Sequence, residues 1–134
     1  MTVDKDGWTE VRLLEVGESS RTGNVYSAAV INDALERLKK HPNLRGQVAP
    51  TRDPYSINED KVSHRFDVAS LHLKDGYLVG KFTPAGPQAA FLKEMLNTPP
   101  ISLAMRSLVS YASDQKTVEK LHIVSFDLCN LPPL

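Results

Sequence analysis

Apolar residues alternate with small or polar ones along the segment that follows Pro99 and Pro100. Two prolines end any helix that precedes them, and residues 101–106 then read Ile-Ser-Leu-Ala-Met-Arg. This period of two predicts a strand with two chemically different faces. One face carries Ser102 and, four residues further on, Arg106. The pattern is typical of a half-buried strand, and it is also the pattern of a nucleophile beside a group that stabilises an anion.

Similar patterns define the other expected elements. Apolar stripes predict a helix over residues 28–40, with Ser27 as its N-cap, and a second helix over residues 87–97 that begins at Pro87. Alternation and turn signals predict five strands, over residues 8–16, 61–73, 77–82, 102–112 and 116–129. Hairpin-linked strands with only two helices predict an α+β fold, in which a mostly antiparallel, barrel-like β-sheet is flanked by two main helices.

Composition narrows the class of protein. The chain has 134 residues, so we expect residues 1–134 to form a single domain. Its 16 Lys and Arg residues balance 16 Asp and Glu residues, so no overall charge draws it to nucleic acid or to an anionic membrane. No apolar run is long enough to span a bilayer, and the N-terminal residues lack the pattern of a signal sequence. We therefore expect an intracellular protein without nucleic-acid or membrane partners.

The usual motifs of cofactor and metal chemistry are missing from the sequence. It contains no Gly-rich phosphate loop, no Walker-type lysine motif and no paired cysteines, since Cys129 is the single cysteine. His64 and His72 could share a strand face, but a spacing of eight residues is too long for both to bind one metal ion on a straight strand. We expect no cofactor and no metal.

Nucleophilic catalysis fits the chain better. Ser102 would need a base within hydrogen-bond reach and a group that orients this base. His64 and His122 are candidate bases, and Asp127 is a candidate carboxylate, although each of the three also has an ordinary structural explanation as a hydrogen-bonded strand residue. Arg106 could stabilise an oxyanion or bind a partner carboxylate. The long polar stretch over residues 43–60 is expected to be a loop, and such loops are often functional.

Taken in order along nearly the whole chain, several segments resemble the prohead (capsid maturation) serine proteases of tailed bacteriophages and, more distantly, the herpesvirus assemblins. The resemblance is carried by Thr22-Gly23-Asn24-Val25-Tyr26, by Gly46 to Pro50, by Val62-Ser63-His64, by Asp75 to Gly80, by Ile101 to Arg106 and by Leu121 to Pro132. Ser102 matches the nucleophile of the family. His122 matches the third triad residue of the assemblins, and Asp127 matches an Asp that is frequent on the same strand of the phage enzymes. The base of the family is the His of a His-Pro pair, which falls on Ala49-Pro50 here.

The resemblance therefore implies a serine endopeptidase fold in which the general base is absent. An alanine cannot take a proton from Ser102, and an unactivated serine is a poor nucleophile. Three explanations are open: Ala49 replaces a histidine to trap the enzyme, the chain is a natural pseudoprotease, or His64 has become the base. The resemblance implies capsid and scaffold proteins as partners, a homodimer or higher homo-oligomer as in the assemblins, and the phage procapsid in the host cytoplasm as location. The alternative is a non-catalytic capsid- or core-associated protein with the same fold.

Overall fold

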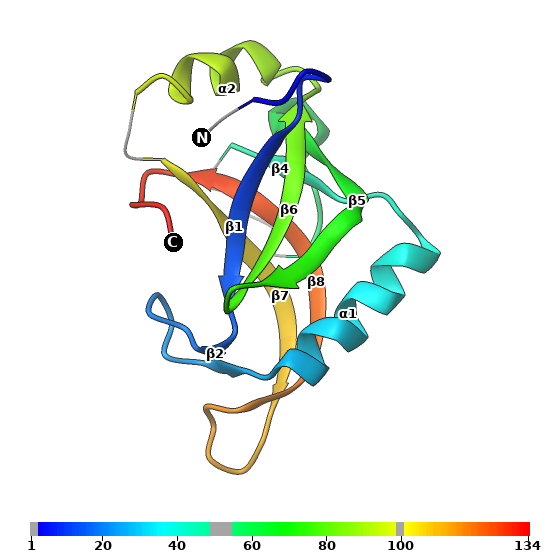
Figure 1. Ribbon diagram of the computed structural model, residues 1–134, viewed down its shortest axis with the longest axis vertical. Helices are drawn as coiled ribbons and strands as arrows, with labels where there is room; N and C mark the ends of the chain where they lie inside the picture. The colour runs from blue at the N-terminus through cyan, green and yellow to red at the C-terminus, as the bar shows by residue number, and fades with distance from the viewer. Residues whose placement is uncertain (1–2, 49–54, 99–100) are drawn as a thin grey trace.

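The computed structural model describes residues 3–48, 55–98 and 101–134 (Figure 1). Its helices are α1 (Ala28–Lys40) and α2 (Ala89–Met95), with a short 3-10 helix over Glu59–Lys61. Its strands are β1 (Thr9–Glu15), β2 (Gly17–Glu18), β3 (Val25–Tyr26), β4 (Arg45–Gln47), β5 (Val62–Lys74), β6 (Tyr77–Pro84), β7 (Ser102–Tyr111) and β8 (Val118–Cys129).

The strands form two main antiparallel sheets that curl around one core. One sheet has the strand order β1-β6-β5-β4, and the other is the long hairpin of β7 and β8. Near one end of the hairpin the sheets meet, because Val48, directly after β4, forms a parallel bridge with Leu128 of β8. The two helices flank this curled arrangement, as Figure 1 shows. The α+β, barrel-like architecture expected from the sequence is confirmed.

Helix α1 has the bounds that its sequence predicts, because its signals are local. The Ser27 hydroxyl accepts a hydrogen bond from the Val30 amide at 3.2 Å, which caps the first turn. Ile31, Ala34 and Leu35 form its buried stripe. Basic side chains occupy the last turn, where they offset the partial negative charge of the helix end. Helix α2 is shorter than the expected 87–97, and its N-cap residue Gln88 makes no side-chain capping hydrogen bond.

The core lies between the two sheets and α1. Phe82, Phe126 and Leu78 are fully buried there, and Phe66 packs against both phenylalanine rings at centroid distances of 6.1 and 5.6 Å. The alternating sequence patterns of β5, β6 and β8 supply these side chains. No helix among the described residues has the length and apolar character needed to cross a membrane.

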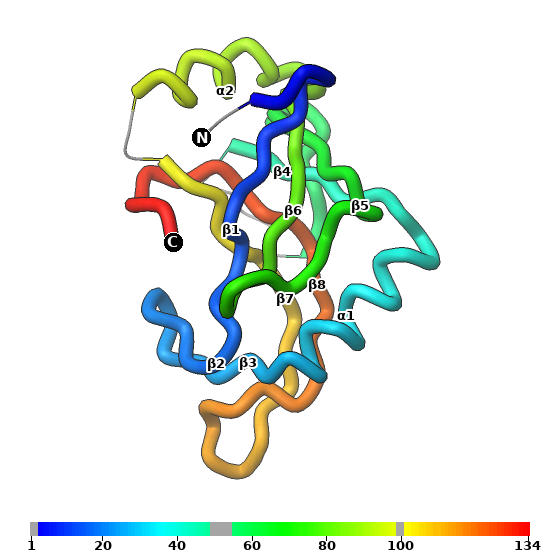
Figure 2. The backbone as a smooth tube through the Cα atoms, in the orientation of Figure 1, coloured from blue at the N-terminus to red at the C-terminus, as the bar shows by residue number. Residues whose placement is uncertain are grey.

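Two parts of the chain depart from the expected elements. The polar stretch over residues 43–60 was expected to be a loop throughout, yet it contains β4, whose three residues pair with β5. The far end of the β7–β8 hairpin extends away from the rest of the domain (Figure 2). At its turn, Asp114 accepts hydrogen bonds from the amides of Lys116 and Thr117 and from the Thr117 hydroxyl. These bonds hold the pKa of Asp114 down at about 2.

Candidate functional site

Ser102 is the first residue of β7 and lies directly opposite Cys129 of β8. The residue is only 1% exposed. Its Oγ accepts a hydrogen bond from the Arg21 guanidinium at 2.7 Å and lies 3.3 Å from the Cys129 Sγ. A hydroxyl that accepts a bond from a cation keeps its own proton available for donation. The Arg21 guanidinium therefore favours negative charge at the Ser102 oxygen, as is needed beside a nucleophile or an oxyanion.

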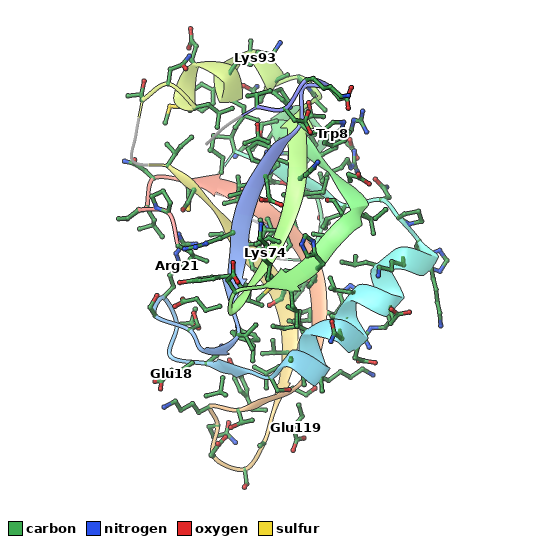
Figure 3. All side chains as sticks on the ribbon, in the orientation of Figure 1. Trp8, Glu18, Arg21, Lys74, Lys93 and Glu119 are labelled. Atoms are coloured by element: carbon green, nitrogen blue, oxygen red, sulfur yellow. The ribbon has the colours of Figure 1, made fainter. Side chains whose placement is uncertain are left out.

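Arg21 reaches this position from the loop between β2 and β3. Besides Ser102 Oγ, its guanidinium donates to the carbonyl oxygens of Leu103 at 3.3 Å and Pro132 at 2.8 Å. Figure 3 shows the side chain directed from its loop toward the segment that follows β8. The Ser19 hydroxyl accepts from the amides of Arg21 and Thr22, so the loop is held by its own side chain. No local sequence pattern marks Arg21, because it lies 81 positions before its partner Ser102.

Asp127 lies on the same face of the hairpin as Ser102. It is opposite Ala104, which alternates with Ser102, so Ser102 and Asp127 are diagonal neighbours with Cα atoms roughly 7–8 Å apart. The carboxylate is buried, and its Oδ1 accepts bonds from the Ser125 hydroxyl at 2.8 Å and the Gln47 amide at 3.2 Å. A third residue placed between Ser102 and Asp127 could therefore contact both side chains.

The Arg106 guanidinium binds the Asp127 carboxylate, and among the described residues no hydrogen bond joins it to Ser102. Its Nε forms an ion pair with Asp127 Oδ2 at 2.5 Å, and its Nη1 donates to the Ser56 carbonyl oxygen at 2.7 Å. The guanidinium thus binds the carboxylate, and the cation beside Ser102 is Arg21. The expectation that Arg106 stabilises an oxyanion at Ser102 does not fit this geometry, because its guanidinium binds the Asp127 carboxylate of the same chain.

His64 is buried in the core and turned away from any role as a base for Ser102. One ring nitrogen, Nε2, lies 2.7 Å from the Phe126 carbonyl oxygen, so it carries the proton, and Nδ1 then accepts from the Ser63 hydroxyl at 2.7 Å. The ring also packs edge-on against Phe66 and Phe82. Burial lowers the pKa of His64 to about 4, which makes it a weak base. The third explanation for the missing base is therefore not supported by this geometry.

His122 does not approach Ser102, although it lies on the partner strand. It is exposed and pairs with Leu108, six residues along β7 from Ser102, which corresponds to about 20 Å. The expectation that His122 orients a base at Ser102 is wrong, because the register of the hairpin separates them. All four histidines of the chain are described, and none of them hydrogen-bonds to Ser102 in the part of the chain that the structure covers.

The position of the expected base, Ala49, lies outside the described residues. Its predecessor Val48 is described and pairs with Leu128, the neighbour of the Cys129 that faces Ser102. Within the described ranges, no group of three or more His, Cys, Asp and Glu side chains is arranged to hold a metal ion.

Comparison with known proteins identifies a likeness of fold. No family model matches the chain, and no curated protein matches it. Among solved structures, the bacteriophage T4 capsid assembly protease, gp21, superposes with a TM-score of 0.72 at 11% sequence identity. The match covers 90% of this chain and 79% of that protein. At this identity the likeness shows that the two chains share a fold.

Proposed function

Starting from the fold that this chain shares with a capsid assembly protease, we propose that it is a serine-protease-like domain of phage head assembly without a general base. Ser102 is at the nucleophile position, and the present sequence cleaves peptide bonds slowly or not at all. The observation that carries this proposal is the environment of the Ser102 hydroxyl. It contacts a cation and a thiol and lies diagonally from a buried carboxylate, but no histidine bonds to it in the described chain.

The proposed chemistry assigns one role to each group. With a histidine at position 49, the imidazole would take the Ser102 proton while Oγ attacks the carbonyl carbon of a peptide. The same imidazolium would then give this proton to the departing amine. Arg21 would stabilise the oxyanion, and Asp127 would orient the histidine. The bridge between Val48 and Leu128 supports this assignment, because it brings the residue before position 49 next to the strand that faces Ser102.

We infer that the partners are capsid or scaffold proteins inside a procapsid. The support is the likeness of fold to a capsid assembly protease. A chain that retains this fold without a base would act by binding these proteins, which agrees with the non-catalytic alternative described above.

The test is to restore the base. The unaltered chain and Ala49→His are incubated with the cognate scaffold and capsid proteins, and cleavage is followed by mass spectrometry. We expect slow or no cleavage by the unaltered chain and much faster cleavage by Ala49→His that disappears in Ala49→His/Ser102→Ala. Ser102-dependent cleavage by the unaltered chain as fast as that by Ala49→His would contradict the missing base. A folded Ala49→His variant without any cleavage would contradict the serine-protease assignment.

Measurements of kcat in the Ala49→His variant distinguish the two candidates for the third triad residue, Asp127 and His122. In Ala49→His, we expect Asp127→Asn to reduce kcat by about two orders of magnitude or more, because the orienting carboxylate is removed. His122→Gln should leave kcat unchanged, since the hairpin register keeps His122 away from Ser102. The opposite pattern would exclude Asp127 as the orienting group.

A further inference from the structure

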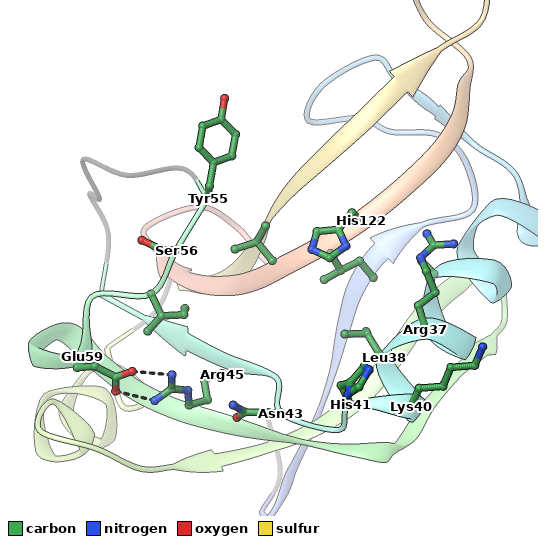
Figure 4. A pocket seen from close by; sticks show the side chains of 14 residues that line it. Arg37, Leu38, Lys40, His41, Asn43, Arg45, Tyr55, Ser56, Glu59 and His122 are labelled. Atoms are coloured by element: carbon green, nitrogen blue, oxygen red, sulfur yellow. Dashed lines mark hydrogen bonds and ion pairs between the residues drawn. The ribbon is translucent and has the colours of Figure 1, made fainter.

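A groove of about 740 Å³ runs between the end of α1, β8 and the segment around Tyr55 to Glu59. In Figure 4, His122 of β8 lies on one side of the groove, and Leu38 and His41 at the end of α1 lie on the other. Its volume is in the range of sites that bind a ligand or a peptide segment. His122 lies about 20 Å along the hairpin from Ser102, so this end of the groove is distant from the proposed cleavage site, whereas Ser56 at the other end is bound by Arg106.

Cationic groups line the rim of the groove. The lining contains three cations, Arg37, Lys40 and Arg45, and one carboxylate, Glu59. Two histidines, His41 and His122, add further N–H donors. The Arg45 guanidinium donates to both carboxylate oxygens of Glu59, at 2.6 and 2.7 Å. The Arg37 guanidinium contacts the Asp33 carboxylate and the Leu121 carbonyl oxygen. Lys40 is exposed and forms no ion pair with any described residue. Carboxylates thus neutralise Arg37 and Arg45, and Lys40 is the lining cation, among the described residues, that remains available to an incoming anionic group.

Apolar side chains form the floor of the groove. They come from α1, from the segment before the 3-10 helix and from β8, and they are Ala34, Leu38, Ile57, Ile123 and Val124. A phosphodiester backbone has no group that would bury this floor, and the balanced charge of the whole chain does not provide the broad basic surface typical of nucleic-acid binding. A ligand that carries both carboxylates and apolar side chains satisfies both parts of the groove.

Besides the charged and apolar side chains, the groove contains an edge of β8 along which an extended peptide backbone can pair. In the described chain, β8 pairs with β7 on one side, and no strand pairs with its other edge at residues 122–124, next to the Leu121 carbonyl oxygen that Arg37 binds. An added strand would place alternate side chains toward the apolar floor and toward the cationic rim. We propose that this groove binds an extended acidic peptide segment of a partner protein, with acidic and apolar residues in alternation. The proposal goes beyond the proposed protease-like function and does not depend on cleavage.

Fluorescence polarisation with a synthetic probe tests whether the groove binds an extended acidic peptide. The probe is a fluorescein-labelled peptide of about eight alternating Glu and Val residues, which is roughly 26 Å long when extended at about 3.3 Å per residue. The control probe has Lys in place of Glu. We expect the unaltered chain to bind the acidic probe, to bind it more weakly as salt is added, and to show no binding of the basic probe. Failure of the folded chain to bind the acidic probe would overturn the proposal.

Charge-reversal variants locate the binding. Lys40→Glu and His122→Glu change the groove, and Lys93→Glu and His72→Glu make the same changes at exposed positions outside it, on α2 (Figure 3) and β5. Each groove variant should weaken binding about three- to tenfold, because an exposed pair contributes up to about 1 kcal/mol and reversal also adds repulsion. Equal losses in the outside variants would show an unspecific charge effect and overturn the proposal. Stronger competition by single-stranded oligo(dT) than by unlabelled acidic peptide would overturn it in favour of nucleic acid.

Discussion

At the scale of single residues, burial decides which side chains can take part in chemistry. His64 shows this most clearly, because both of its ring nitrogens are bound within the core and its pKa is lowered to about 4. The unfolded chain, with an ordinary histidine pKa of about 6.5, binds the proton more tightly. Stability due to the neutral ring is therefore present above pH 6.5 and decreases as the pH falls toward 4.

We expect the free energy of unfolding to decrease by about 2 kcal/mol between pH 7 and pH 5 through His64 alone. Urea unfolding at the two pH values measures this. His64→Gln should remove most of the pH dependence, and His72→Gln, which changes an exposed histidine, should retain it. An unchanged pH dependence in His64→Gln would contradict the assignment.

The buried ion pair of Arg106 and Asp127 gives a second prediction at this scale. Asp127→Ala leaves a guanidinium without its carboxylate in a site where the Arg106 side chain is 13% exposed, so we expect a loss of about 3 kcal/mol of stability. Arg106→Met/Asp127→Leu should lose less, because no charge stays buried alone. The control is Arg45→Met at the more exposed pair with Glu59, where the loss should be much smaller. Equal losses at both pairs would contradict the importance of burial.

At the scale of elements, the pairing of strands depends on close approach at a few positions. Gly46 of β4 is one of them, because a Cβ atom there would collide with the His64 ring and with the Phe126 carbonyl oxygen. The carbonyl belongs to the backbone of β8 and cannot rotate away. Gly46 is therefore what allows β4 to pass between β5 and β8 and to bring Val48 to Leu128.

Gly46→Ala should destabilise the fold by about 3 kcal/mol, as expected for overpacking against a rigid neighbour. Gly80→Ala is the matched control. An added Cβ at Gly80 would meet the end of the Leu71 side chain, which can shift, so about 1 kcal/mol is expected there. The comparison is made by urea unfolding of both variants. A smaller loss at Gly46 than at Gly80 would contradict this account of the β4 contact.

The elements also show where sequence reasoning succeeds and where it stops. Helix α1 is predictable with its bounds, because cap and apolar stripe lie within one segment. Strand β4 has three residues, Arg-Gly-Gln, and no alternation, so nothing in the sequence marks it. For His122, the sequence indicates the strand but not the register, and the register sets its distance from Ser102. Arg21 is a further case, because a loop residue that contacts a strand 81 positions later leaves no periodic signal.

At the scale of the whole molecule, one core connects the two sheets and α1. Within it, the Phe66 ring packs against both Phe82 and Phe126. We therefore expect one cooperative unfolding transition, as for a single domain. Trp8, the single tryptophan, lies near the start of β1 with the Arg65 guanidinium 4.9 Å from its ring centre. Its fluorescence and the far-UV circular dichroism should give the same urea midpoint. Separate midpoints would contradict a single cooperative unit.

The three hydrogen bonds of Arg21 have a consequence for the order in which the molecule is built. Its acceptors are on residues 102, 103 and 132, so a chain emerging from the ribosome exposes Arg21 long before any of them exists. Closing so long a loop is entropically costly until the intervening strands have folded. The environment of the Ser102 hydroxyl is thus completed only after residue 132 has been synthesised, and a nascent chain truncated before that residue lacks the full set of Arg21 contacts.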